Sequence, residues 1–211
     1  MCALFAYGNS SNILNFLKKL DFSLLTQSEQ NIKKACKGLK YRFENEEDIA
    51  QIFITLKRAK QSFSLQDRFY EAFRQNKRVD EGLSALIRAF YELNTYSSYG
   101  YEFFFGKAFK NQPKSPLKRY NMFLRWCVRK DELDLGLWEC IKPASLLIPL
   151  DTHTHKVSLH LGLLKRRQYD FKAVLELSQS LRELDPLDPI KYDFALYRLG
   201  QSGEYISFGK N

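Results

Sequence analysis

The residues best suited to chemistry fall in two short stretches of the chain, and the first is basic and aromatic. Between Phe103 and Lys130 there are eight positive charges and no acidic residue: Lys107, Lys110, Lys114, Lys118, Arg119, Arg125, Arg129 and Lys130. Lysines near a loop-to-helix junction suit phosphate contacts, because a helix N-terminus adds free N–H groups and the positive end of its dipole. The stretch therefore predicts either a nucleic-acid surface or an ordinary solvated face over core aromatics.

The second stretch runs from Pro149 to His155 and places an aspartate at an expected helix start. Asp151 could serve only as the N-cap of that helix, a role worth about 1 kcal/mol. It could also join His153 and His155 as a metal ligand. The spacing is weak evidence for a metal site, because side chains at positions i and i+2 of a helix point in different directions. A metal site would also need Cys140 or His160 to lie close by.

Composition and charge narrow the class of partner. The 211 residues are 45% hydrophobic, which excludes intrinsic disorder, and 33 Lys+Arg against 24 Asp+Glu give a net charge of +9. Such an excess favours a polyanion, nucleic acid first and an acidic membrane surface second. Four cysteines without a C-x-x-C pair indicate free thiols in a reducing compartment. Without a signal peptide or a spanning apolar run, we expect a cytoplasmic protein.

Helical signals recur along almost the whole chain, and no strand alternation is convincing. Asn9, Asn45 and Ser64 are expected N-caps, and Thr26 with Glu29 resembles a capping box. The pattern predicts an all-α fold of about ten helices, near 9–20, 27–37, 45–56, 64–73, 83–93, 116–129, 138–143, 151–162, 170–184 and 188–200. A Tyr-rich turn is expected at 96–101, and Gly162 and Gly200 are expected to end helices.

Taken together, the two stretches resemble the helix-hairpin-helix DNA glycosylase superfamily, typified by endonuclease III. In that superfamily a catalytic lysine begins the second helix of the hairpin, and a catalytic aspartate follows in a V-D-T-H-type motif. The segment Pro116 to Leu124 matches with Lys118 as the lysine, and Leu150-Asp151-Thr152-His153 matches with Asp151 as the aspartate. Segments 5–8, 41–43, 125–126, 134–138 and 191–196 also resemble a bacterial branch of it.

The resemblance implies a fold and an activity. It implies one domain over residues 1–211, built as two helical lobes with a helix-hairpin-helix-like motif and the active site in the cleft between them, with the catalytic motifs in 113–200. Lys118 would attack C1′ of the sugar and displace the base, assisted by Asp151. The resulting Schiff base would permit β-elimination, which nicks the strand. The expected partner is damaged double-stranded DNA, bound by a monomer.

The spacing between Lys118 and Asp151 is similar to that in the archaeal 8-oxoguanine DNA glycosylases. In that group an aspartate and an aromatic residue four positions later contact the damaged base, and Asp193 and Tyr197 match them here. Arg125 replaces a lysine of that pocket, and the aromatic Phe208 could close over the base. The residues alone leave alternatives open, since Asp193 could pair with Lys191 or Arg198, Tyr197 could be core, and the tail holding Phe208 could be frayed.

Other expected DNA contacts are spread over the chain: Lys114, Arg119, His153, Lys156, Tyr7 and Asn9. Tyr7 or Asn9 stands where the superfamily commonly has a glutamine. The glycine-rich hairpin is replaced by Lys114-Ser115-Pro116-Leu117, and the cysteine spacing of an iron–sulfur loop is missing. We therefore expect no cluster and no other cofactor. The alternative functions are a non-catalytic DNA-binding domain, a glycosylase for another damaged base and, less favoured, a His/Asp metal-dependent hydrolase.

Overall fold

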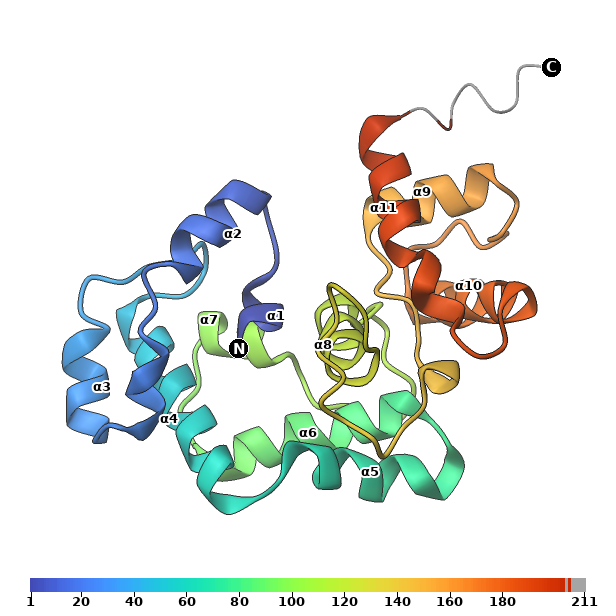
Figure 1. The fold of residues 1–211 in the computed structure, drawn as a ribbon. Coiled ribbons are helices and arrows are strands. Elements are labelled where there is room, and N and C mark those ends of the chain that lie inside the picture. The colour runs from blue at the N-terminus through green and yellow to red at the C-terminus, as the bar shows by residue number, and fades with distance from the viewer. Residues whose placement is uncertain (204, 206–211) are drawn as a thin grey trace. The chain divides into compact units, whose positions relative to one another are not determined.

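The computed structural model describes residues 1–203 and 205, and over them the chain is helical. These described residues form eleven α-helices and three 3₁₀ helices, and their β pairing is limited to two isolated bridges. The predicted all-α class is therefore confirmed. The chain divides into two compact units, Met1–Lys110 and Asn111–Asn211, coloured blue to green and green to red in Figure 1.

The first unit is built around a long central helix and a helical hairpin. Its elements are α1 (Cys2–Phe5), α2 (Ser10–Leu17), η1 (Phe22–Thr26), α3 (Glu29–Ala35), α4 (Glu46–Ser62), α5 (Leu65–Asn76), α6 (Val79–Leu93) and α7 (Tyr99–Phe105). Helix α4 packs against η1, α3, α6 and α7, while α5 and α6 pack on each other. Its core is rich in fully buried aromatic side chains: Phe5, Phe53, Phe69, Tyr101, Phe104 and Phe105. Burial of such large rings is the main source of stability for a unit of this size.

The second unit holds the remaining helices and the apolar segment before α9. Its elements are α8 (Lys118–Val128), η2 (Pro143–Ser145), α9 (Thr152–His160), α10 (Phe171–Leu184), η3 (Pro189–Tyr192) and α11 (Asp193–Ser202). Helix α9 packs against α11, and α10 packs against η3. The buried Ile148, in the segment between η2 and α9, donates its N–H to Ser178 Oγ of α10 at 2.9 Å.

Several helix starts follow from local capping chemistry, as the sequence predicts. Asn9, Asn45 and Ser64 each accept a backbone N–H as N-caps of α2, α4 and α5, and Asn45 forms a full capping box with Asp48. The capping box expected at Thr26 is wrong, because Ser28 caps α3 instead. These caps need only the neighbouring backbone, so residue type and spacing suffice to find them.

Three expected elements differ in the structure. The segment 138–143 is not a helix before Pro143, because Trp138 N–H donates to Cys127 O at 2.8 Å and Gly136 turns with φ 59°. The expected turn at 96–101 instead leads into α7, whose N-cap is Ser98. The last helix begins as 3₁₀ at Pro189, continues as α11 and ends at Gly203 rather than at Gly200.

None of the helices in residues 1–203 and 205 has both the length and the apolar character that crossing a membrane requires.

Candidate active site

Lys118 is the first residue of α8 and follows an unusual turn. The preceding residue, Leu117, has left-handed backbone angles (φ 51°, ψ 33°), so the chain bends sharply before the helix. Asn121, one turn into α8, donates its Nδ2 to Pro116 O at 3.1 Å and ties this bend to the helix. The Lys118 side chain is 33% exposed. It therefore starts from a fixed backbone position and remains accessible to solvent.

Asp151 caps α9 and faces Lys118 at the same time. Its Oδ1 accepts the Thr154 N–H at 2.8 Å, which confirms the capping role expected from the sequence. Its Oδ2 lies 3.7 Å from Lys118 Nζ, and the Asp151 side chain is only 12% exposed. The two oxygens thus have separate roles, one holding the helix start and one facing the amine.

The histidines beside Asp151 make other contacts. His155 is buried, and its Nε2 lies 3.2 Å from Arg166 O while its ring meets Tyr169 edge-on. His153 is exposed, with Nδ1 3.3 Å from Gly200 O. Within residues 1–203 and 205, no group of three or more His, Cys, Asp or Glu side chains is arranged to hold a metal ion. Both histidine rings therefore contact other residues of the protein.

Asp193, at the start of α11, belongs to the same electrostatic environment. Arg125 of α8 donates Nη1 to Asp193 Oδ2 at 2.5 Å. Burial of the carboxyl raises the pKa of Asp193 to about 6; Arg125 opposes this rise, the charge of Asp151 adds to it, and Lys118 opposes it. Lys118 and Asp151 thus both act electrostatically on the Asp193 carboxyl, and all three residues belong to the second unit. The alternative pairing of Asp193 with Lys191 is wrong, since Lys191 pairs with Asp185.

The family comparison covers this whole site. Residues 1–202 match the family described as Protein of unknown function (DUF2400). The chain belongs to that family. Neither the search of curated proteins nor the search of solved structures gives a significant match.

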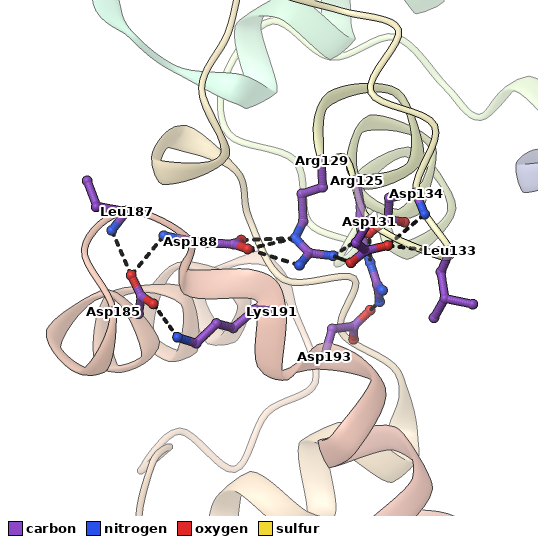
Figure 2. A network of polar contacts seen from close by, with 10 residues as sticks. All are labelled: Arg125, Arg129, Asp131, Leu133, Asp134, Asp185, Leu187, Asp188, Lys191 and Asp193. Atoms are coloured by element: carbon purple, nitrogen blue, oxygen red, sulfur yellow. Dashed lines mark hydrogen bonds and ion pairs between the residues drawn. The ribbon is translucent and has the colours of Figure 1, made fainter.

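A network of buried ion pairs supports Arg125 in this DUF2400 chain (Figure 2). Arg125 Nε donates to Asp134 Oδ2 at 3.1 Å, and Arg129 donates to the same oxygen. Arg129 also donates to Asp188 at 2.9 and 3.0 Å and to Asp131 at 2.7 Å. Burial by itself would lower the pKa of Arg129, but the hydrogen bonds and charges of these carboxylates outweigh it and raise that pKa. The network fixes α8 relative to η3 and the first residue of α11.

This network corrects the sequence interpretation of the basic stretch. Arg125 and Arg129 are 7% and 8% exposed and bind carboxylates, so they are not part of a free cationic face. Sequence reasoning missed Arg129, Asp134 and Asp188 as site-supporting residues. The only available signal was the i, i+4 spacing of the two arginines, because their partners lie up to 68 residues away in the chain.

Tyr197 and His153 meet where α9 and α11 pack. Their rings are edge-on with centroids 6.1 Å apart, and Tyr197 accepts a hydrogen bond from Gln201 Nε2 at 2.7 Å. A Cβ on Gly200 would lie 2.8–2.9 Å from the His153 Cβ and backbone, so the glycine permits this close approach. Tyr197 is partly exposed, which leaves part of its ring outside the core.

The remaining predicted contacts lie at several places. Lys114 and Lys156 are exposed and Arg119 is partly exposed, all three in the second unit. Tyr7 and Asn9 belong to the first unit, where Asn9 caps α2. Phe208 lies outside the described residues.

Proposed function

We propose that this protein is a bifunctional DNA glycosylase and AP lyase of base excision repair, with damaged double-stranded DNA as substrate and 8-oxoguanine as the excised base. The observation that carries the proposal is the 3.7 Å separation between Lys118 Nζ and Asp151 Oδ2 at two helix starts. An amine beside a carboxylate is the pair that Schiff-base excision requires. The resemblance to the helix-hairpin-helix superfamily supplies the substrate class.

The proposed reaction begins at the Lys118 amine. A lysine ammonium has no lone pair, so the first step is loss of a proton, for which Asp151 Oδ2 is the acceptor. The amine then attacks C1′ of an extruded nucleotide; the N–C1′ bond forms as the glycosidic bond breaks, and the base leaves with the bonding pair. Opening of the sugar ring gives a protonated imine. The departing base takes up the proton that Asp151 received from Lys118, and the Asp151 carboxylate restored in this way stabilises the positive charge of the iminium.

Strand cleavage follows from the same imine. Removal of a proton from C2′ delivers electrons toward the iminium, and the C3′–O bond breaks with the phosphate as leaving group. Water then hydrolyses the imine and restores the Lys118 amine. The reaction needs no external oxidant or reductant, because each step moves only protons and bonding pairs.

Asp193 is the residue proposed to read the base. The change from guanine to 8-oxoguanine gives N7 a hydrogen to donate, and a carboxylate oxygen can accept it. Asp193 Oδ2 already accepts from Arg125, while Oδ1 accepts no hydrogen bond from any residue in the described part of the chain. Tyr197 lies one turn later on α11 and offers a ring for stacking. Arg125 would then orient Asp193 in this pocket.

The wider DNA surface is part of the same proposal. Lys114, Arg119 and Lys156 would contact phosphates, with His153 near the start of α9 and Tyr7 and Asn9 in the first unit. We also propose that the chain has two helical lobes and a helix-hairpin-helix-like motif. In this motif the bend at Leu117 would take the place of the glycine-rich hairpin before α8.

Borohydride trapping tests the proposal directly. Wild-type protein mixed with an 8-oxoguanine duplex and borohydride should form a covalent complex, and Lys118→Gln should form none. Lys172→Gln, an exposed lysine of α10, is the matched control and should trap like wild type. Trapping by Lys118→Gln at the wild-type level would disprove the assignment. A panel of duplexes that each carry one lesion separates 8-oxoguanine from uracil and alkylated bases.

One observation favours a second candidate, a non-catalytic DNA-binding helical domain. Lys118 and Asp193 each face an opposite charge, an arrangement that also occurs in purely structural ion pairs. This candidate predicts salt-dependent DNA binding with no trapping and no nicking of any damaged duplex in the panel.

A further inference from the structure

A tight turn in the first unit holds two large side chains in solvent. Tyr41 and Glu44 exchange backbone hydrogen bonds of 2.9 and 2.8 Å, so Arg42 and Phe43 form the tip of a two-residue turn. Tyr41 and Glu44 are buried, whereas Arg42 and Phe43 are exposed. Arg42 has φ 49°, a left-handed conformation that favours glycine and is strained for a residue with a Cβ. The turn therefore presents an arginine at a position where glycine would fold more easily.

Phe43 of the turn belongs to an exposed aromatic cluster. Phe43 and Tyr99 are 41% and 69% exposed, and their ring centroids lie 5.5 Å apart with the ring planes nearly perpendicular. Phe103 lies 4.6 Å from Phe43, and Tyr7 lies parallel to Phe43 at 6.2 Å. The Arg42 guanidinium carbon is 5.7 and 5.6 Å from the Tyr7 and Phe43 ring centroids.

The aromatic cluster is held rigidly by the elements beneath it. A Cβ on Gly100 of α7 would lie 2.6 Å from Phe43 O, so the glycine lets α7 pack directly against the turn. The Tyr7 hydroxyl donates to the buried Glu44 carboxylate, which fixes the Tyr7 ring. The rings thus present a preorganised apolar surface rather than a set of independent side chains.

Tyr41 and Arg42 of the turn also line an open hollow of about 290 Å³, and its lining has no acidic residue. It is lined by Asn12, Asn15, Phe16, Lys19, Lys40, Tyr41 and Arg42. Lys19, Lys40 and Arg42 form no ion pair with any carboxylate in residues 1–203 and 205. Three uncompensated cations and two amide side chains around one hollow suit an anion with several oxygen acceptors.

We propose that this turn, with its aromatic cluster and its cationic hollow, binds an unpaired nucleotide of single-stranded DNA. The base stacks on Phe43 and Tyr99, and the adjoining phosphates bind Lys19, Lys40 and Arg42. An acidic peptide could pair with the cations but would leave the exposed rings without a stacking partner. A nucleotide has both a phosphate for the cations and a base for the rings. The proposal is independent of Lys118 chemistry, which belongs to the other unit.

Fluorescence anisotropy with a labelled twelve-residue oligothymidylate tests this site in the full chain. Arg42→Gly should weaken binding about tenfold or more while the melting temperature stays at or above the wild-type value, because glycine relieves the left-handed strain. The matched control is Lys77→Gly, which also removes a charge from an exposed left-handed residue and should leave binding unchanged. Equal binding by wild type and Arg42→Gly would overturn the proposal.

Two further measurements separate stacking from charge and this site from the second unit. A twelve-residue strand of tetrahydrofuran spacers has phosphates but no bases, and Tyr99→Ala should weaken binding of oligothymidylate but not of this strand. A strand carrying 5-iodouracil should crosslink on irradiation to a peptide containing Phe43 or Tyr99, in Lys118→Gln as in wild type. Crosslinks confined to residues 111–211, or equal binding of polyglutamate, would overturn the proposal.

Discussion

Lys118 Nζ lies 3.7 Å from Asp151 Oδ2, and the two residues begin different helices of one compact unit. This separation permits charge attraction but exceeds the usual hydrogen-bond length of about 2.7–3.2 Å. The amine is therefore held near the carboxylate without being locked to it. Because Asp151 Oδ1 already caps α9, the position of Oδ2 is fixed by the fold rather than by the lysine.

Substitution of Asp151 should separate capping from chemistry. Asparagine caps helices as well as aspartate does, so Asp151→Asn should keep α9 and change the free energy of unfolding by no more than about 1 kcal/mol. Excision and trapping should fall by a factor of about 10² or more, because the proton acceptor for Lys118 is lost. Single-turnover excision rates and chemical denaturation measure the two effects. Asp151→Ala, which also removes the cap, should lose about 1 kcal/mol more, and a fully active Asp151→Asn would leave Asp151 as a cap only.

Arg129 should be a major determinant of stability. Its buried guanidinium pairs with Asp131, Asp134 and Asp188, so Arg129→Met would leave the part-buried Asp188 without its cation and the buried Asp134 with Arg125 alone. Loss of one partner from a buried ion-pair network typically costs about 3–5 kcal/mol. Urea denaturation should show a loss of this size, while the exposed Arg167→Met should stay within about 0.5 kcal/mol of wild type. A loss below about 1 kcal/mol would show that the network is not maintained in solution.

Gly200 should be intolerant of even a methyl group. At a solvent-exposed helix position, Gly→Ala raises the free energy of unfolding by about 1 kcal/mol because alanine has the higher helix propensity. Here the added Cβ would lie 2.8–2.9 Å from His153, including its backbone, so Gly200→Ala should destabilise by about 1–3 kcal/mol. Thermal melting measures this, and the exposed Phe194→Ala on the same helix serves as control. A stabilised Gly200→Ala would contradict the close packing of α9 on α11.

The parts of this fold that sequence predicts are those decided by neighbouring residues. The N-caps Asn9, Asn45, Ser64 and Asp151 each bind a backbone N–H two or three residues away, so type and spacing were sufficient. The prediction of a helix at 138–143 is wrong because the Trp138 N–H bonds to Cys127 O, near the end of α8, instead of to a neighbouring turn. That outcome depends on tertiary packing rather than on local pattern.

The candidate site shows the same division between local and long-range information. Lys118 and Asp151 could be paired from a resemblance, because their motifs are contiguous in sequence. Arg125 could not be assigned its partners, since Asp134 and Asp193 lie nine and 68 residues away. In the sequence, a series of basic residues without neighbouring acidic residues indicates a DNA-binding surface. In the folded chain, acidic residues distant in sequence pair with some of these cations. Arg125 and Arg129 thus belong to the support of the site rather than to its exposed face.

Asp193 should make stability fall as pH rises. Its pKa is raised to about 6 in the folded protein, against an ordinary value of 3.8. Between these pH values the folded chain holds a proton that the unfolded chain has lost, so ionisation favours unfolding. The stability contributed by the protonated acid is present at pH 4 and is lost by about pH 7. A rise in pKa from 3.8 to about 6 corresponds to about 3 kcal/mol.

Comparison with Asp193→Asn isolates this effect, because asparagine does not titrate. The difference in free energy of unfolding between wild type and Asp193→Asn should shift by about 2 kcal/mol toward the variant from pH 4 to pH 7, because the unfolded carboxyl is already partly ionised at pH 4. Asp170 is the matched control, since its pKa is lowered to about 2 by the hydrogen bond from Arg166. Its carboxylate stabilises the fold above pH 4 and loses that effect only as pH falls toward 2. Asp170→Asn should therefore differ from wild type by a constant amount between pH 5 and pH 7, and a constant difference for Asp193→Asn as well would show that Asp193 titrates normally.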